Sequence, residues 1–169
     1  MSKKPKHVKI ALVGSGGVGK STLASRLVTG DFVDTSMTVG ISVETWTIEE
    51  DASGDSYKAV AFDLGGQQQF RFFQESMIQG AKIALIVFDV SRFETLMGLD
   101  EWIEMTEGIP SYRRILVGNK LDLGMLIPEG EIVKIAAKWN MPWVIVSSSN
   151  GENFDDLEQR IIQAIRSIE

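Results

Sequence analysis

A glycine-rich segment, Gly14–Ser21, lies between an apolar run, His7–Val13, and an amphipathic run that begins at Ser21. This segment, here called the glycine loop, fits the pattern G-x-x-x-x-G-K-[ST], which carries chemical meaning when a strand precedes it and a helix follows. Glycines let successive backbone N–H groups converge on phosphate oxygens, and the helix N-terminus adds positive charge. Lys20 adds a further positive charge, and the Ser21 hydroxyl can ligate Mg²⁺. The segment predicts a nucleoside polyphosphate site; the alternative is a glycine-rich turn without a ligand.

Strand-like and helix-like segments alternate along the rest of the chain. Val8, Ile10 and Leu12 form one face of a first strand, and the run at 83–90 is apolar enough for a strand buried on both faces. The expected strands are His7–Val13, Ile41–Glu49, Tyr57–Phe62, Ile83–Val90, Ile115–Val117 and Val144–Val146. Helices are expected at Ser21–Val28, along the stripe Leu96, Leu99 and Ile103, from Pro128 onward, and along the stripe from Phe154 to Ile168.

This order of segments predicts one α/β domain over residues 1–169. A turn signal at Asp51–Asp55 joins the second and third strands as a hairpin, whereas helices separate most of the others. We therefore expect a three-layer, doubly wound sheet of the P-loop NTPase type. It should have six mostly parallel strands, one antiparallel edge strand and about five helices.

Composition excludes several classes of protein. The 169 residues are 44% hydrophobic and 24% charged, as in a globular domain, and no run of about 18 apolar residues is present to span a membrane. The absence of cysteine excludes disulfides, thiolate metal sites and a lipid anchor attached to cysteine. The net charge of −6 argues against nucleic acid as the main partner. Because no signal peptide is recognisable, we expect a cytoplasmic location.

The N-terminal residues 1–6 are expected to form a flexible tail that carries Lys3, Lys4 and Lys6. The simplest interpretation of these lysines is a solvated tail. The alternative is a weak contact with anionic lipid, which would place the protein at the periphery of a membrane.

Polar residues follow several of the expected strands. Asp63 follows the third strand, Asn119–Asp122 follows the fifth, and Ser147–Asn150 follows the sixth. Ligands in doubly wound sheets bind at the carboxyl ends of the strands. We therefore expect these residues and the glycine loop to share one site.

The segment Asp63–Gln67 has the chemistry of a metal-linked phosphate site. A carboxylate that leaves a buried strand near a phosphate loop can hold Mg²⁺ directly or through water, although Asp63 could instead cap the next helix. The Gly66 N–H can approach a terminal phosphate closely. Gln67 both donates and accepts hydrogen bonds, as is needed to orient a water molecule for in-line attack.

The segment Asn119–Asp122 predicts recognition of guanine. A carboxylate at Asp122 can accept hydrogen bonds from the N1–H and the exocyclic amino group of guanine, whereas adenine offers neither donor at that edge. A polar site left unpaired by the wrong ligand discriminates by on the order of 10⁴-fold. Asn119 can fix the loop, and the Lys120 stem can cover one face of the base. Taken alone, the four residues would be an ordinary turn after a strand.

These motifs, in this order and spacing, resemble the Ras-like small GTPases over essentially the whole chain. The two glycines in Asp63–Gln67 are more like Arf-type proteins, and the mixture suggests a prokaryotic or archaeal member. The segments most similar to Rab-type proteins are Thr38–Gly40, Gln67–Arg71, Gly80-Ala81, Phe88–Ser91 and Leu116–Asp122.

The resemblance implies roles at the phosphates. Lys20 would bind the β- and γ-phosphates, Ser21 and Thr38 would ligate Mg²⁺, and Asp63 would hold a Mg²⁺-bound water. Gly66 would contact the γ-phosphate, while Gln67 would position the hydrolytic water. The implied catalytic residues are Gln67, Lys20 and Thr38. Without the resemblance, Thr38 would merely begin a strand.

The resemblance also implies roles at the base. Phe32 would lie against the guanine, and Asn119, Lys120, Asp122 and the Ser148 N–H would read it. The complete set of expected nucleotide contacts is Gly14, Ser15, Gly16, Gly17, Val18, Gly19, Lys20, Ser21, Thr22, Phe32, Thr38, Asp63, Gly66, Asn119, Lys120, Asp122, Ser147, Ser148 and Ser149.

Some positions depart from the family pattern. The segment between Phe32 and Thr38 is about one residue short and lacks the Tyr that commonly closes over the γ-phosphate. Ser148-Ser149 replaces the usual Ala-Lys, so that one basic contact is lost. No Arg occurs between residues 31 and 37 to serve as an arginine finger in cis, and a partner would have to donate one.

The resulting functional expectation is a switch that binds GTP or GDP with Mg²⁺ and hydrolyses GTP slowly. Effectors, exchange factors and GTPase-activating proteins are expected at residues 31–43 and 64–79. The alternative is a GTP-dependent scaffold with little turnover. A P-loop ATPase or kinase is disfavoured by Asp122.

Overall fold

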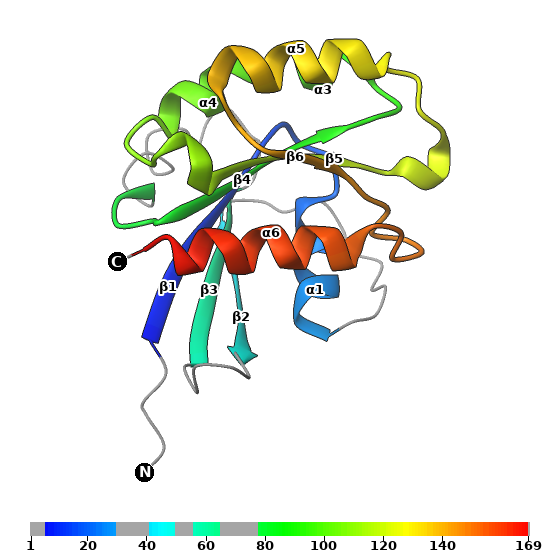
Figure 1. The fold of residues 1–169 in the computed structure, drawn as a ribbon. Helices are drawn as coiled ribbons and strands as arrows, with labels where there is room; N and C mark the ends of the chain where they lie inside the picture. The colour runs from blue at the N-terminus through cyan, green and yellow to red at the C-terminus, as the bar shows by residue number, and fades with distance from the viewer. Residues whose placement is uncertain (1–5, 30–40, 50–55, 65–77, 169) are drawn as a thin grey trace.

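The computed structural model describes residues 6–29, 41–49, 56–64 and 78–168, with side chains described for 6–29 and 78–168. A six-stranded sheet lies in the middle of the molecule, in the strand order β2-β3-β1-β4-β5-β6 (Figure 1). The β2 strand pairs antiparallel with β3, and every other neighbouring pair is parallel. The strands are β1 (Lys6–Val13), β2 (Ile41–Glu49), β3 (Ser56–Leu64), β4 (Ile83–Asp89), β5 (Arg114–Asn119) and β6 (Trp143–Ile145).

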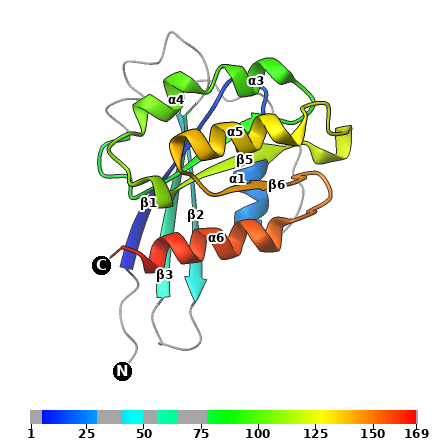
Figure 2. The same cartoon turned by 45° about the horizontal axis from the view of Figure 1, so that its top comes forward.

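Helices cover both faces of this sheet, as the α/β expectation requires. One face packs against α1 (Lys20–Thr29) and α6 (Phe154–Arg166). The other packs against α3 (Phe93–Met97), α4 (Asp100–Met105) and α5 (Glu129–Trp139), which come forward in Figure 2. None of the helices in the described part of the chain is long and apolar enough to cross a membrane.

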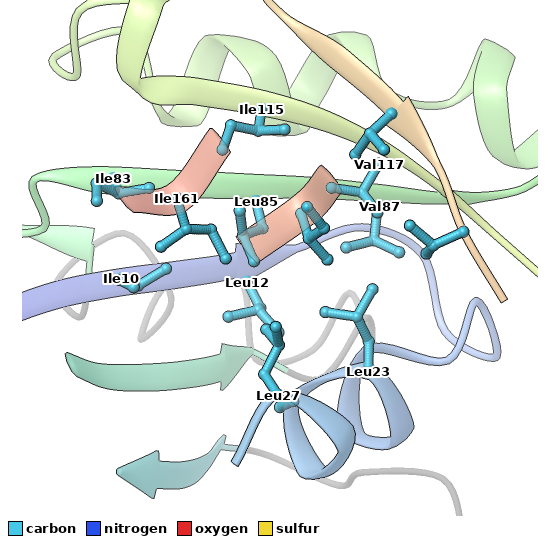
Figure 3. Close-up of a cluster of buried hydrophobic side chains, with 14 of the residues drawn as sticks. Ile10, Leu12, Leu23, Leu27, Ile83, Leu85, Val87, Ile115, Val117 and Ile161 are labelled. Carbon is cyan, nitrogen blue, oxygen red and sulfur yellow. The ribbon is translucent and has the colours of Figure 1, made fainter. Parts of the chain in front are cut away.

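Two apolar clusters, one on each face, hold the layers together. In β4, whose residues are all buried, Leu85 points into the cluster under α1 and α6, whereas Ile86 points to the opposite face. Figure 3 shows Leu85 together with Leu12, Leu23 and Ile161, which come from β1, α1 and α6. This alternation follows from the two-residue period of a strand, and it explains why a strand covered on both faces reads as a continuous apolar run.

The helix expected along Leu96, Leu99 and Ile103 is wrong as a single element. The structure divides it into α3 and α4, and Gly98 ends the first of them. Glycine is a poor helix former. The Leu99 N–H donates to the Leu96 oxygen, three residues earlier rather than four, at 3.3 Å, and this three-residue pattern is common where a helix ends. The apolar stripe is nevertheless buried, because both short helices turn it toward the sheet.

Other boundaries move by a residue or two. The last strand starts at Trp143 rather than Val144, and Pro128 precedes the first turn of α5 rather than opening it. The expected hairpin turn at Asp51–Asp55 lies outside the described residues.

Replacing Leu85 with Ala should lower the free energy of unfolding by about 2–5 kcal/mol, because a fully buried side chain would leave a cavity in the central strand. Leu126→Ala is the matched control: Leu126 is 71% exposed, and its loss should change stability by less than about 0.5 kcal/mol. Urea unfolding at one fixed nucleotide concentration measures both. Equal midpoints for the two variants would contradict this view of the core.

Candidate nucleotide site

The glycine loop joins the carboxyl end of β1 to α1 and closes around the Lys20 side chain. The Lys20 Nζ donates to the Gly14 oxygen at 2.9 Å and to the Ser15 oxygen at 3.0 Å. Only 5% of Lys20 is exposed, so its ammonium is fixed at the base of the loop rather than extended into solvent. The charge is therefore held beside the backbone N–H groups of the loop, which is the arrangement that phosphate oxygens require.

Two of the glycines are required by close packing. A Cβ on Gly14 would overlap the backbone oxygen of Val87 in β4, and a Cβ on Gly19 would overlap the Asn119 amide nitrogen. Both residues have positive φ angles, 144° and 91°, which L-residues with side chains rarely adopt. The loop can therefore lie directly against the ends of β4 and β5 only with glycine at these positions.

Asn119, at the carboxyl end of β5, links the glycine loop to the segment Ser147–Ser149, here called the base loop. Its Nδ2 donates to the Val18 oxygen at 3.0 Å. Its Oδ1 accepts from the Ser148 N–H at 3.2 Å and from the Ser148 hydroxyl at 2.9 Å. Asn119 is 1% exposed, so one buried amide joins two loops that are far apart in the sequence.

Lys120 extends from the same strand end across to the glycine loop. Its backbone is left-handed, with φ 67°, and its Nζ donates to the Gly17 oxygen at 2.7 Å. The ammonium also lies 3.6 Å from Oδ2 of Asp89. The Oδ1 atom of Asp89 accepts hydrogen bonds from the Ser91 N–H and from the Ser91 hydroxyl. The Lys120 stem is thereby held in one orientation beside the glycine loop.

Asp89 is a site residue that the sequence analysis did not assign. It is a buried carboxylate at the end of β4, and its contact with Lys120 gives it a place in the site. The available signal was an acidic residue that interrupts the apolar run at 83–90, at the strand end where ligands bind.

The Asp122 carboxylate is oriented by the base loop. Its Oδ1 accepts from the Ser147 hydroxyl at 2.7 Å. The hydroxyl oxygen of Ser147 in turn accepts from the Asn150 N–H at 3.2 Å. Asp122 is exposed, whereas Ser147 is fully buried. One carboxylate oxygen is thus fixed by a rigid neighbour, and the group as a whole still faces solvent.

The structure brings many of the sequence-predicted residues together at one edge of the sheet. The loops that follow β1, β5 and β6 lie on the same side (Figure 1). Asp63 pairs in register with Leu12 near the end of β1, which places its backbone beside the start of the glycine loop. Ser21 and Thr22 lie in the first turn of α1, and Ser149 is exposed at the base loop. Phe32, Thr38, Gly66 and Gln67 lie outside the described residues.

One expected contact differs in detail. The Ser148 N–H, which the resemblance assigns to the base, donates to Asn119 Oδ1 in this structure. At 3.2 Å this hydrogen bond is at the long end of the usual range, and the Ser148 hydroxyl donates to the same oxygen at 2.9 Å.

The fold and the site define an α/β protein with a phosphate-type loop at the carboxyl edge of a mostly parallel sheet. The sequence matches the Ras family over residues 9–167. It is 33% identical over 165 residues to the Ras-related protein Rab-11A of Dictyostelium discoideum, covering 95% of this chain and 76% of that protein. It is 31% identical, with the same coverage, to the Ras-related protein RABA1b of Arabidopsis thaliana. The chain belongs to the Ras family of small GTPases.

Proposed function

We propose that this small GTPase is a switch that binds GTP or GDP with Mg²⁺ and hydrolyses GTP slowly. The observation that carries the proposal is the hydrogen-bonded unit around Asn119. A single buried side chain joins the glycine loop, which suits phosphates, to the base loop, which orients the Asp122 carboxylate. A phosphate site and a base site held in one rigid unit suit a whole nucleotide better than a free phosphate or a free base.

At the base, Asp122 would accept from the N1–H and the amino group of guanine. An ionised carboxylate has about four acceptor positions, so the Ser147 hydroxyl uses one and leaves capacity for both base donors. The Ser148 N–H, which donates to Asn119 Oδ1 at 3.2 Å, would also donate to the guanine O6. The Lys120 stem would cover one face of the guanine ring, and the Phe32 side chain would lie against the guanine as well.

At the phosphates, Lys20 would neutralise charge on the β- and γ-oxygens from its fixed position in the glycine loop. Ser21 and Thr38 would ligate Mg²⁺, with Asp63 bound through water, and oxygen ligands of this kind suit the ion. When bound, Mg²⁺ would reduce the charge on the phosphates. Gly66 would donate to the γ-phosphate, and Gln67 would orient the attacking water.

The direct test is the base preference of the purified protein. We expect GDP or GTP to co-purify, and added GDP to compete far better than ADP in a fluorescent-nucleotide displacement assay. Comparable affinities for GDP and ADP would overturn the guanine assignment and would favour an ATPase.

Replacing Gln67 with Leu should reduce single-turnover phosphate release by at least about tenfold, because Leu cannot hydrogen-bond the attacking water and each lost hydrogen bond in the transition state costs about 1 kcal/mol or more. The affinity for GTP should be unchanged, since Leu removes only the group that orients water. Gln163→Leu is a matched control on exposed surface of α6. Wild-type turnover in the Gln67→Leu protein would remove Gln67 from the mechanism. Negligible turnover in the unaltered protein, even with cell extract added, would favour the scaffold alternative.

The proposed partners follow from the switch. Effectors, exchange factors and a protein that donates an arginine would act at residues 31–43 and 64–79, as the resemblance implies. A cytoplasmic location, with membrane contact through partners or through Lys3, Lys4 and Lys6, is part of the same proposal.

A further inference from the structure

Arg26 projects from the last turn of α1 toward the base loop. Its Nη1 donates to the Ser148 backbone oxygen at 3.0 Å and lies 3.4 Å from the Ser149 oxygen. These carbonyls belong to the two residues that occupy the Ala-Lys positions of the family pattern. A guanidinium from α1 therefore supports a loop that lacks its usual basic residue.

The surroundings of Arg26 are shaped to receive this side chain. Gly151 has a φ of 84°, and a Cβ there would overlap the Arg26 guanidinium. The Arg26 Cζ also lies 5.6 Å from the ring centroid of Phe154, which is buried at the start of α6. A cation over an aromatic face at this distance is an attractive contact. The guanidinium of Arg26 thus packs between the base loop, Gly151 and the start of α6.

The position of Arg26 complements that of Asn119. Asn119 accepts hydrogen bonds from the N–H and the hydroxyl of Ser148, whereas Arg26 donates to the carbonyl oxygen of the same residue. Ser148 is therefore held through both of its backbone polar groups. Because α1 starts at Lys20, Arg26 also connects the phosphate end of the site with the base end through one short helix.

We propose that Arg26 is a positioning residue for guanine: it holds the base loop so that the Ser148 N–H is presented to the guanine O6. This inference rests on the proposed function, since it requires a guanine nucleotide at the site. Arg26 touches neither the base nor the reacting atoms. Its effect is on base recognition and on nucleotide release.

Two variants test the inference. Arg26→Met keeps much of the stem packing but donates no hydrogen bond, and it should speed GDP release by about tenfold or more, as expected for loss of charged hydrogen bonds. Arg26→Lys retains a donor for one carbonyl but not the fork that a guanidinium provides, so its release rate should be intermediate. Arg166→Met is the matched control, at the exposed end of α6.

The affinity ratio of GDP to ADP separates positioning from a general structural role. Adenine has an amino group where guanine has O6, so only GDP uses the Ser148 N–H. The ratio should fall by about tenfold in Arg26→Met and less in Arg26→Lys. Displacement of fluorescent GDP by both nucleotides measures the ratio, and thermal unfolding without nucleotide reports the fold.

Two results would overturn the inference while leaving the proposed function in place. One is an unchanged GDP release rate in both variants; the other is an equal weakening of GDP and ADP with the ratio preserved. Should Arg26→Met not fold, a wild-type ratio in Arg26→Lys would have the same meaning. If the unaltered protein does not bind GDP, the proposed function fails, and this inference fails with it.

Discussion

Replacing Asp122 with Asn is expected to change the preferred base from guanine to xanthine. In the structure the Ser147 hydroxyl donates to Oδ1 of Asp122, and an Asn would keep that acceptor and turn its amide nitrogen to the base. The amide N–H₂ would then oppose the amino group of guanine, whereas the C2 carbonyl of xanthine would accept from it. A donor placed against a donor leaves both unpaired in a partly desolvated site.

The expected magnitude is a loss on the order of 10⁴-fold in GDP affinity, since a site built for a polar partner rejects a mismatched ligand by about that factor. Xanthosine diphosphate should gain affinity in the same variant. Competition against a fluorescent nucleotide measures both ligands. Asp100→Asn, at the exposed start of α4, is the control and should leave the preference unchanged. An Asp122→Asn protein that still selects GDP would show that Asp122 does not read the base.

Replacing Lys20 with Met should weaken GDP and GTP binding by roughly 30-fold to several thousand-fold, because truncating one partner of a buried charge pair costs about 2–5 kcal/mol. The phosphates would lose the ammonium, and the Gly14 and Ser15 oxygens would lose the donor that holds the glycine loop. Lys20→Arg should restore little, since the planar guanidinium does not fit a space shaped around a buried ammonium.

Isothermal titration with GDP in Mg²⁺ measures the loss, and Lys134→Met provides a control on an exposed lysine of α5. The rise in melting temperature that saturating GDP gives the unaltered protein should shrink in Lys20→Met, because ligand stabilisation falls with affinity. Affinity within threefold of the unaltered protein would contradict the role given to Lys20.

The α/β class could be predicted because its signals are local. The apolar residues of β1 and the continuous apolar run of β4 reflect strands that are buried on both faces, and buried positions are recognisable from their residue types. The division between α3 and α4 was missed because the periodic stripe continues across Gly98, so the hydrophobic pattern alone does not show the break. The exact first and last residues of helices and strands, which differ from the expected ones by a residue or two, are likewise set by hydrogen bonds that the hydrophobic pattern does not show.

The candidate site shows the same difference between local and long-range information. The glycine loop and Asn119–Asp122 are short motifs with fixed chemistry, and the structure brings them together through Asn119 and Lys120. Asp89 and Arg26 act through partners that are 31 and 122 residues away in the sequence, and the motif patterns assign a nucleotide role to neither of them. Their roles follow from the fold, which places them beside the loops that they support.

The position of β1 in the sheet has a consequence for how the protein is made. This strand is synthesised before all the others, yet it lies in the interior of the sheet between β3 and β4. At about 5–20 residues per second, several seconds of translation separate β1 from the completion of both of its neighbours. During that time the backbone N–H and C=O groups along both of its edges have no native strand to pair with, and unpaired edges of this kind can pair with other chains. The strand that leads into the glycine loop can therefore complete its pairing only after β3 and β4 have both been synthesised.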